Sequence, residues 1–110
     1  MSPKPGQPEP ANRNDPRLQQ ALRKFGYALH NVKALHDAGV AIAVGTDAGM
    51  PGTLHGTATL REMELLVQAG LTPAEALIAG TANSARVMGQ LADRGTIEAG
   101  KAADLALWDI

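Results

Sequence analysis

The sequence contains no cysteine, few aromatic residues and no excess of either charge. The lack of cysteine excludes disulfides and thiolate metal sites, and it fits a reducing compartment. A formal net charge of -1 gives no basic surface for nucleic acid or for an anionic membrane, so we expect neither partner. No apolar run is long enough for the core of a signal peptide or for a membrane span, and the sequence therefore predicts a cytoplasmic protein.

The 110 residues, of which 45% are hydrophobic and 19% charged, are typical of one globular domain or less. Residues 1–15 are rich in proline, asparagine and charge, and we expect a disordered arm or a loop cut from a larger context. After Pro16, apolar side chains recur every three or four residues, which predicts a long amphipathic helix that Gly39 ends. The residues of this apolar stripe are Leu18, Ala21, Leu22, Phe25, Leu29, Val32 and Leu35.

The run VAIAV, residues 40–44, has the length and the β-branched content of a strand that is buried on both faces. The glycine-rich stretch GTDAGMPGTLHGT after it predicts a loop, and a further helix runs from near Ala58 to Gly70. The sequence predicts only one strand of this doubly buried kind, and the strand therefore has no parallel neighbour within this chain. The pattern therefore indicates an α/β fold of which this chain is one slice, or a small complete α/β domain that pairs its own strands and dimerises.

Two further helices and two short strands are predicted near the end of the sequence. Thr72, Pro73 and Glu75 form the pattern of a capping box that begins a short helix. Thr81 is expected to cap another helix, which stops at Gly89. The tail GTIEAGKAADLALWDI predicts two short strands around a Glu-Ala-Gly-Lys turn.

Asp47 follows directly after the predicted strand. In parallel α/β folds the active site lies at the carboxyl ends of the strands, where a carboxylate can bind a divalent metal or accept a proton. The alternative is that Thr46 and Asp47 only satisfy backbone donors in a glycine-rich turn. From its position alone, Asp47 fits the turn role better than the catalytic one.

The sequence contains three histidines that could act together with Asp47. His30 and His36 are six residues apart on the predicted first helix, which does not place them on one face, and both are expected at the surface or the helix end. His55 shares the loop of Asp47 and can orient a substrate or carry a proton. A solvent-exposed or cap-forming His55 is an equal alternative.

The motifs together resemble a known family. The stretch GVAIAVGTDAGMPGTLHGTATLREMELLVQAGLTPAEALIAGTANSARVMG, followed by GTIEAGKAADLALWD, is similar to the C-terminal part of the amidohydrolase superfamily. The similarity is to the branch of imidazolonepropionase-like and Xaa-Pro dipeptidase-like enzymes, and it runs from about Asn31 to the end of the sequence. Single motifs such as GTD are weak, whereas their order and spacing are specific.

The resemblance implies a (β/α)8 barrel that holds one or two divalent metals, usually zinc. Asp47 matches the aspartate that ends the eighth strand, binds metal and acts as base toward the hydrolytic water, and His55 matches a loop histidine near the substrate. Residues 16–92 then correspond to the last helix–strand–helix slice of the barrel, and residues 93–110 to terminal strands of the accompanying β-sandwich. In that tail Gly100, Lys101 and Asp104 are expected to be structural.

The family's other metal ligands have no counterpart in this sequence: a His-x-His pair, a carboxylated lysine or glutamate, and two further histidines. We therefore expect part of an enzyme that hydrolyses a carbon–nitrogen bond in a small amide, dipeptide or cyclic amide, with the isolated chain inactive. One alternative is a small non-catalytic protein that self-associates or docks to a partner. Another is a metal site that Asp47 and His55 build at an oligomer interface. An uncovered apolar strand also predicts a homo-oligomer.

Overall fold

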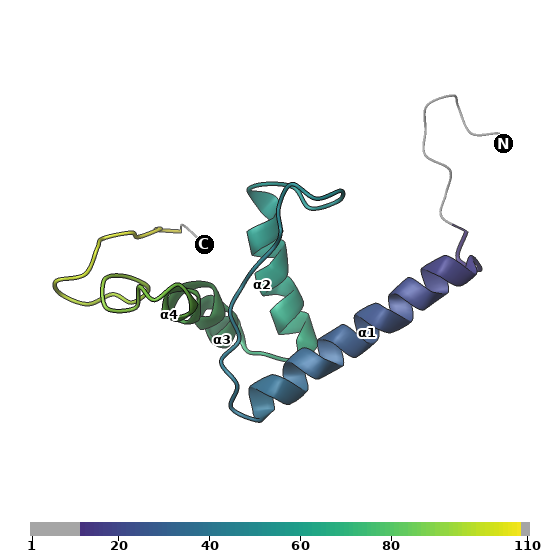
Figure 1. The fold of residues 1–110 in the computed structure, drawn as a ribbon, viewed down its shortest axis with the longest axis horizontal. Helices are drawn as coiled ribbons and strands as arrows, with labels where there is room; N and C mark the ends of the chain where they lie inside the picture. Colours follow the sequence, from purple (N-terminus) through teal and green to yellow (C-terminus); the bar gives the residue numbers. More distant parts are fainter. Residues whose placement is uncertain (1–11, 109–110) are drawn as a thin grey trace.

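The computed structural model describes residues 12–108, which fold into helices joined by irregular segments (Figure 1). The expected arm at residues 1–15 lies mostly outside the described residues, as do the last two positions of the tail. Helix order along the chain is α1 (Pro16–Asp37), α2 (Thr57–Ala69), α3 (Pro73–Ile78), the π-helical turn η1 (Ala79–Asn83) and α4 (Ser84–Val87). Within 12–108, no helix is both long enough and apolar enough to cross a membrane.

The predicted beginning and end of α1 are confirmed. Asp15 caps the helix by accepting a hydrogen bond from the Arg17 N–H at 2.8 Å, and Pro16 occupies its first turn. At the other end Gly39 has a φ of 82°, a left-handed conformation that favours glycine. The Val40 N–H donates to the Leu35 carbonyl at 3.0 Å, which completes a Schellman motif.

The same device ends α2 and α4. Gly70 and Gly89, the two predicted stops, have φ values of 113° and 69°. After α2 the Leu71 N–H donates to the Leu66 carbonyl at 3.1 Å, and the side chains of these two leucines belong to the same buried cluster. The helix ends are therefore determined by local sequence, because each depends on a glycine and on bonds within six residues.

The segment from Pro73 to Val87 differs from the prediction of two separate helices. Its capping box is confirmed, since the Thr72 hydroxyl accepts from the Glu75 N–H and the Glu75 carboxylate accepts from the Thr72 N–H. The prediction that Thr81 caps a new helix is wrong. Its hydroxyl donates to the Leu77 carbonyl at 2.7 Å, and the chain stays helical through η1 into α4.

The strands predicted at residues 40–44 and in the tail are not formed in the described part of the chain, where the sole β-type pairing is an isolated bridge between Ala48 and Met50. Within 12–108 the chain therefore shows the helices of the expected α/β fold but none of its strands. The physical reason is that a strand needs a partner strand for its backbone groups. Residues 42 and 44 instead bond to the helical segment that contains η1.

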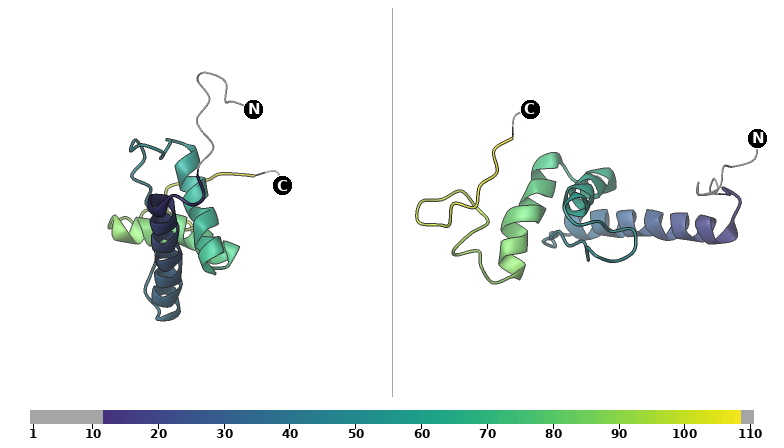
Figure 2. Two further views of the ribbon diagram at one scale, coloured as in Figure 1. Left: turned by 90° about the vertical axis from the view of Figure 1, so that its right-hand side faces the viewer. Right: turned by 90° about the horizontal axis from the view of Figure 1, so that it is seen from above.

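The core is small and lies where α2, α3 and η1 meet residues 40–44. Its buried members are Leu66, Leu71, Ala76 and Ala79, and partly buried Val32, Ile42, Val44 and Met63 pack against them. Helix α1 contributes no buried residue, and its N-terminal half projects away from the other helices in Figure 1 and in the right view of Figure 2. Most of the predicted apolar stripe of α1 is therefore exposed, including Leu22, Phe25 and Leu35.

Candidate functional site

Asp47 lies in the loop that joins residues 40–44 to α2. Its φ of 49° is the single positive value at a non-glycine residue within 12–108. Aspartate tolerates this left-handed conformation better than most residues, although it costs about 1–2 kcal/mol. The Asp47 carbonyl accepts a hydrogen bond from the Met50 N–H at 3.3 Å, so the backbone turns sharply at this position.

The side chains of Thr46 and Asp47 differ in what they do for this turn. The Thr46 hydroxyl accepts a hydrogen bond from the Ala48 N–H at 3.2 Å. Asp47 is exposed, and among residues 12–108 we find no hydrogen bond or ion pair to its carboxylate. Thr46 therefore fills the turn-forming role, and the Asp47 carboxylate is not used by the turn.

His55 lies against the same loop. The loop closes on itself through a bond from the Gly49 N–H to the Thr53 carbonyl at 2.9 Å. A Cβ added to Gly49 would lie 3.3 Å from His55 Nε2, so the imidazole packs over Gly49, two residues after Asp47. The structure thus brings His55 onto the Asp47 loop, although no hydrogen bond joins their side chains within the described residues.

Replacing Gly49 by alanine is expected to disturb His55. The φ of 104° would cost about 1–2 kcal/mol for an alanine, and the new methyl group would press on the imidazole. Gly52 is a matched control, because its φ is 86° and nothing lies within 4 Å of the position of its Cβ. We expect the His55 ring resonances to shift in G49A and to stay unchanged in G52A, measured by NMR. Equal shifts in both variants would contradict this packing.

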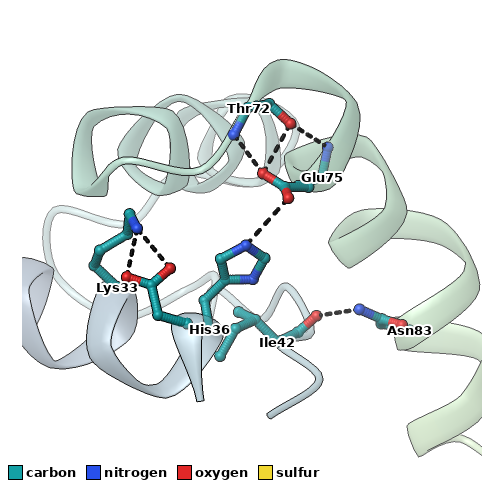
Figure 3. A network of polar contacts seen from close by, with 7 residues as sticks. Lys33, His36, Ile42, Thr72, Glu75 and Asn83 are labelled. Atoms are coloured by element: carbon teal, nitrogen blue, oxygen red, sulfur yellow. Dashed lines mark hydrogen bonds and ion pairs between the residues drawn. The ribbon is translucent and has the colours of Figure 1, made fainter. Parts of the chain in front are cut away.

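A second polar cluster lies near the beginning of residues 40–44 (Figure 3). His36 Nε2 lies 3.2 Å from one Glu75 carboxylate oxygen. The other oxygen accepts from the Thr72 N–H at 2.7 Å and from the Thr72 hydroxyl at 2.8 Å. The sequence placed His36 correctly near the end of α1 but gave no sign of its contact with Glu75, because that contact depends on how α1 and α3 pack.

The bonds from Thr72 hold the pKa of Glu75 below its ordinary value of 4.5, and the neighbouring His36 adds to this effect. A lowered pKa in the folded state means that Glu75 stabilises the fold above pH 4.5, and that this stabilisation is lost as the pH falls through the lower folded-state value. We expect the melting temperature to fall as the pH is lowered through and below 4.5, and to fall less in Glu75→Gln. Circular dichroism melts measure this difference, and identical losses in the two proteins would contradict it.

Lys101 organises the segment after α4. Its amine donates to the Leu91 carbonyl at 2.7 Å and to the Thr96 hydroxyl at 2.6 Å, and it lies 3.5 Å from the Glu98 carboxylate. Asp104 pairs with Arg94 at 3.3 Å. Both Lys101 and Asp104 therefore have the structural roles expected of them, although they stabilise an irregular loop and not a pair of strands.

The described residues do not form a metal site by themselves. Within 12–108, no three side chains of histidine, aspartate or glutamate lie close enough together to hold a metal ion. A catalytic zinc takes three protein ligands and a water molecule. Asp47 can offer a carboxylate to such a site, and the remaining ligands would have to come from elsewhere.

Comparison with known proteins connects the Asp47 loop to a family. Residues 17–110 match the family model described as the Amidohydrolase family, whose members generally bind divalent metals. No solved structure matches the chain significantly.

Several curated relatives are imidazolonepropionases. That of Agrobacterium fabrum is 48% identical over 83 residues, which cover 74% of this chain and 20% of the relative. The Caulobacter vibrioides protein is 46% identical over 80 residues, which cover 72% of this chain and 20% of the relative. That of Geobacillus sp. is 42% identical over 81 residues, covering 73% of this chain and 19% of the relative.

This chain therefore spans about a fifth of the length of these relatives. The family match covers most of the chain, including α1 after Pro16, the Asp47 loop, the other described helices and the Lys101 segment. On these grounds the chain belongs to the amidohydrolase family.

Proposed function

We propose that this chain contributes Asp47 to the active site of a metal-dependent hydrolase that cleaves a carbon–nitrogen bond. The observation that supports this proposal most directly is that the local turn does not use the Asp47 carboxylate. It is exposed at the turn that follows residues 40–44, and the turn itself is stabilised by Thr46 instead. A side chain held on a left-handed backbone and not needed for local structure is a candidate for binding or catalysis.

A carboxylate in this position has two uses. Its oxygens can bind a hard divalent cation, and it can accept a proton from the water that attacks the substrate. The metal, when bound, supplies a water molecule of lowered pKa. In this proposal the chain presents the Asp47 oxygens on a short turn, and His55, which packs over Gly49 of the same loop, contacts the substrate.

The rest of the site would come from polypeptide that this chain does not contain. Its matched relatives are about five times longer than the aligned segment, and a (β/α)8 barrel needs about 250 residues. In this proposal α1, residues 40–47 and α2 are one slice of such a barrel. The residues that bind the metal beside Asp47 lie on its other strands, and zinc is the metal that we propose.

The amount of exposed surface supports this proposal. Within 12–108, 17 large hydrophobic side chains are exposed, whereas only five hydrophobic residues are buried. The exposed side chains include Phe25, Leu35 and Val40, which belong to α1 and to the segment after it. Further polypeptide packed against these elements would bury them, as a barrel does.

For the substrate we propose a small cyclic amide of the imidazolonepropionate type, because the matched relatives are imidazolonepropionases. A dipeptide or another amide is the broader possibility within the reaction class. The cytoplasmic location remains a prediction from composition.

Exposed apolar surface also favours a second candidate function, a small non-catalytic protein that associates with itself. Sedimentation, thermal melting and zinc binding of the 110-residue chain together distinguish the two candidates. A stable, cooperatively melting dimer or tetramer that binds no zinc would favour self-association. A chain that aggregates alone would favour the hydrolase.

A chimera tests the hydrolase directly. The matching 83-residue segment of the Agrobacterium fabrum imidazolonepropionase is replaced by the corresponding residues of this chain. We expect the chimera to hydrolyse imidazolonepropionate, and the same enzyme without the segment to be inactive. A folded chimera that binds metal but does not hydrolyse this substrate or any dipeptide would overturn the proposal.

A further inference from the structure

The π-helical turn η1 makes direct bonds to the segment that leads to Asp47. Asn83 Nδ2 donates to the Ile42 carbonyl at 2.9 Å, which joins residues 41 positions apart in the sequence (Figure 3). The Val44 N–H donates to the Ala79 carbonyl at 3.2 Å. Two residues of η1 therefore bond to two residues of the segment, and both contacts lie just before Asp47.

The π-helical conformation gives a reason for these bonds. In a regular α-helix a carbonyl accepts from the N–H four residues later, whereas a π turn is wider and shifts this pairing. The Ala79 carbonyl, at the first residue of η1, accepts from the Ser84 hydroxyl at 2.8 Å as well as from the Val44 N–H. The wider turn thus directs a helix carbonyl to the neighbouring segment.

Packing around this contact is close. Ala79 is 1% exposed. A Cβ added to Gly80 would lie 3.1 Å from Met63 Sδ and 3.7 Å from Val44 Cγ2, so the small residue lets η1 approach the segment. Asn83 itself is oriented by Arg86, whose Nη1 donates to its amide oxygen at 3.0 Å.

Asp47 lies three residues after Val44, so the backbone between them spans about 10 Å at most. Its position is limited upstream by the bonds to η1 and downstream by the bond from the Met50 N–H to the Asp47 carbonyl. We propose that Asn83 is a positioning residue: through the Ile42 carbonyl it fixes the segment that presents the Asp47 carboxylate. This inference rests on the proposed role of Asp47 and adds the element that holds it in place.

The first test uses the 110-residue chain and needs no catalysis. Asn83→Asp keeps the shape of the side chain but replaces the donating NH2 group by an oxygen, and Asn83→Ala removes the side chain. We expect amide exchange at Val44 to become roughly 3- to 10-fold faster in both variants, the effect of one lost hydrogen bond. In both variants we also expect the Asp47 amide to move more on the nanosecond timescale than in the wild type.

Asn31→Asp is the matched control, since it makes the same chemical change at an exposed position of α1. It should leave exchange at Val44 unchanged. Exchange at Leu66 reports whether the variants still fold, and it should match the wild-type value. Wild-type protection of Val44 in both Asn83 variants would overturn the proposal.

The second test uses the chimera. Asn83→Asp should lower kcat about 10-fold or more with little change in KM, because the substrate still binds while Asp47 is misplaced. An unchanged kcat would overturn the positioning role and leave the proposed function intact. An inactive wild-type chimera would count against the proposed function alone, and the exchange result would then decide whether η1 holds the segment.

Discussion

Asp47→Asn should lower kcat/KM of the chimeric hydrolase by about 1000-fold or more. Asparagine has the same shape, but its amide cannot accept a proton at neutral pH and binds a cation more weakly than a carboxylate. Loss of a general base alone typically costs about 100- to 10,000-fold. Steady-state hydrolysis of imidazolonepropionate measures the effect.

Asp37→Asn serves as the control for this variant. Asp37 pairs with Lys33 one turn earlier on α1, where it is exposed, and an exposed pair of this kind contributes about 0.3–0.5 kcal/mol. Its loss should leave kcat/KM within a factor of two. A similar loss of activity in both variants would point to damage of the fold and not to a role of Asp47 in the reaction.

Gly95→Ala should be the most destabilising single substitution in the segment after α4. Its φ is 93°, and an added Cβ would lie 2.5 Å from Ala85 Cβ and 3.2 Å from Ala82 Cα. The backbone conformation costs about 1–2 kcal/mol for alanine, and the overlap about 1–3 kcal/mol more. The free energy of unfolding should therefore fall by about 2–5 kcal/mol.

Gly100→Ala separates the cost of the backbone conformation from the cost of the steric overlap. Gly100 has a φ of 91°, and nothing lies within 4 Å of the position of its Cβ. It should show the backbone cost alone, about 1–2 kcal/mol. Urea unfolding followed by circular dichroism compares the two variants. Equal losses would mean that the loop carrying Gly95 does not pack on η1 and α4 as described.

The helix boundaries could be predicted because their signals are local. Asp15 and Pro16 begin α1, Gly39 ends it, and the Thr72–Glu75 capping box begins α3. Each of these signals acts within about one helical turn, so the tertiary structure is not needed to interpret them.

What could not be predicted depends on distant contacts. The chain stays helical from α3 through η1 to α4. In this helical segment η1 bonds to Ile42 and Val44, which are far away in the sequence. The strand expected at residues 40–44 fails for the related reason that pairing requires a partner strand. The lysine of the predicted turn, Lys101, has no local signal that reveals its bond to the Leu91 carbonyl.

The candidate site was predictable in part. The place of Asp47 after an apolar run and the presence of His55 in the same loop follow from sequence order. The left-handed backbone of Asp47 and the packing of the imidazole on Gly49 do not, because both arise from the way the loop closes through Thr53.

Metal binding by the Asp47 carboxylate can be measured through the visible absorption spectrum of the cobalt-substituted chimera. The band positions and intensities report the ligands around the ion. We expect Asp47→Asn to change this spectrum and to weaken cobalt binding about 10-fold or more, while Asp37→Asn changes neither. An unchanged spectrum and unchanged affinity in Asp47→Asn would contradict metal binding by this carboxylate.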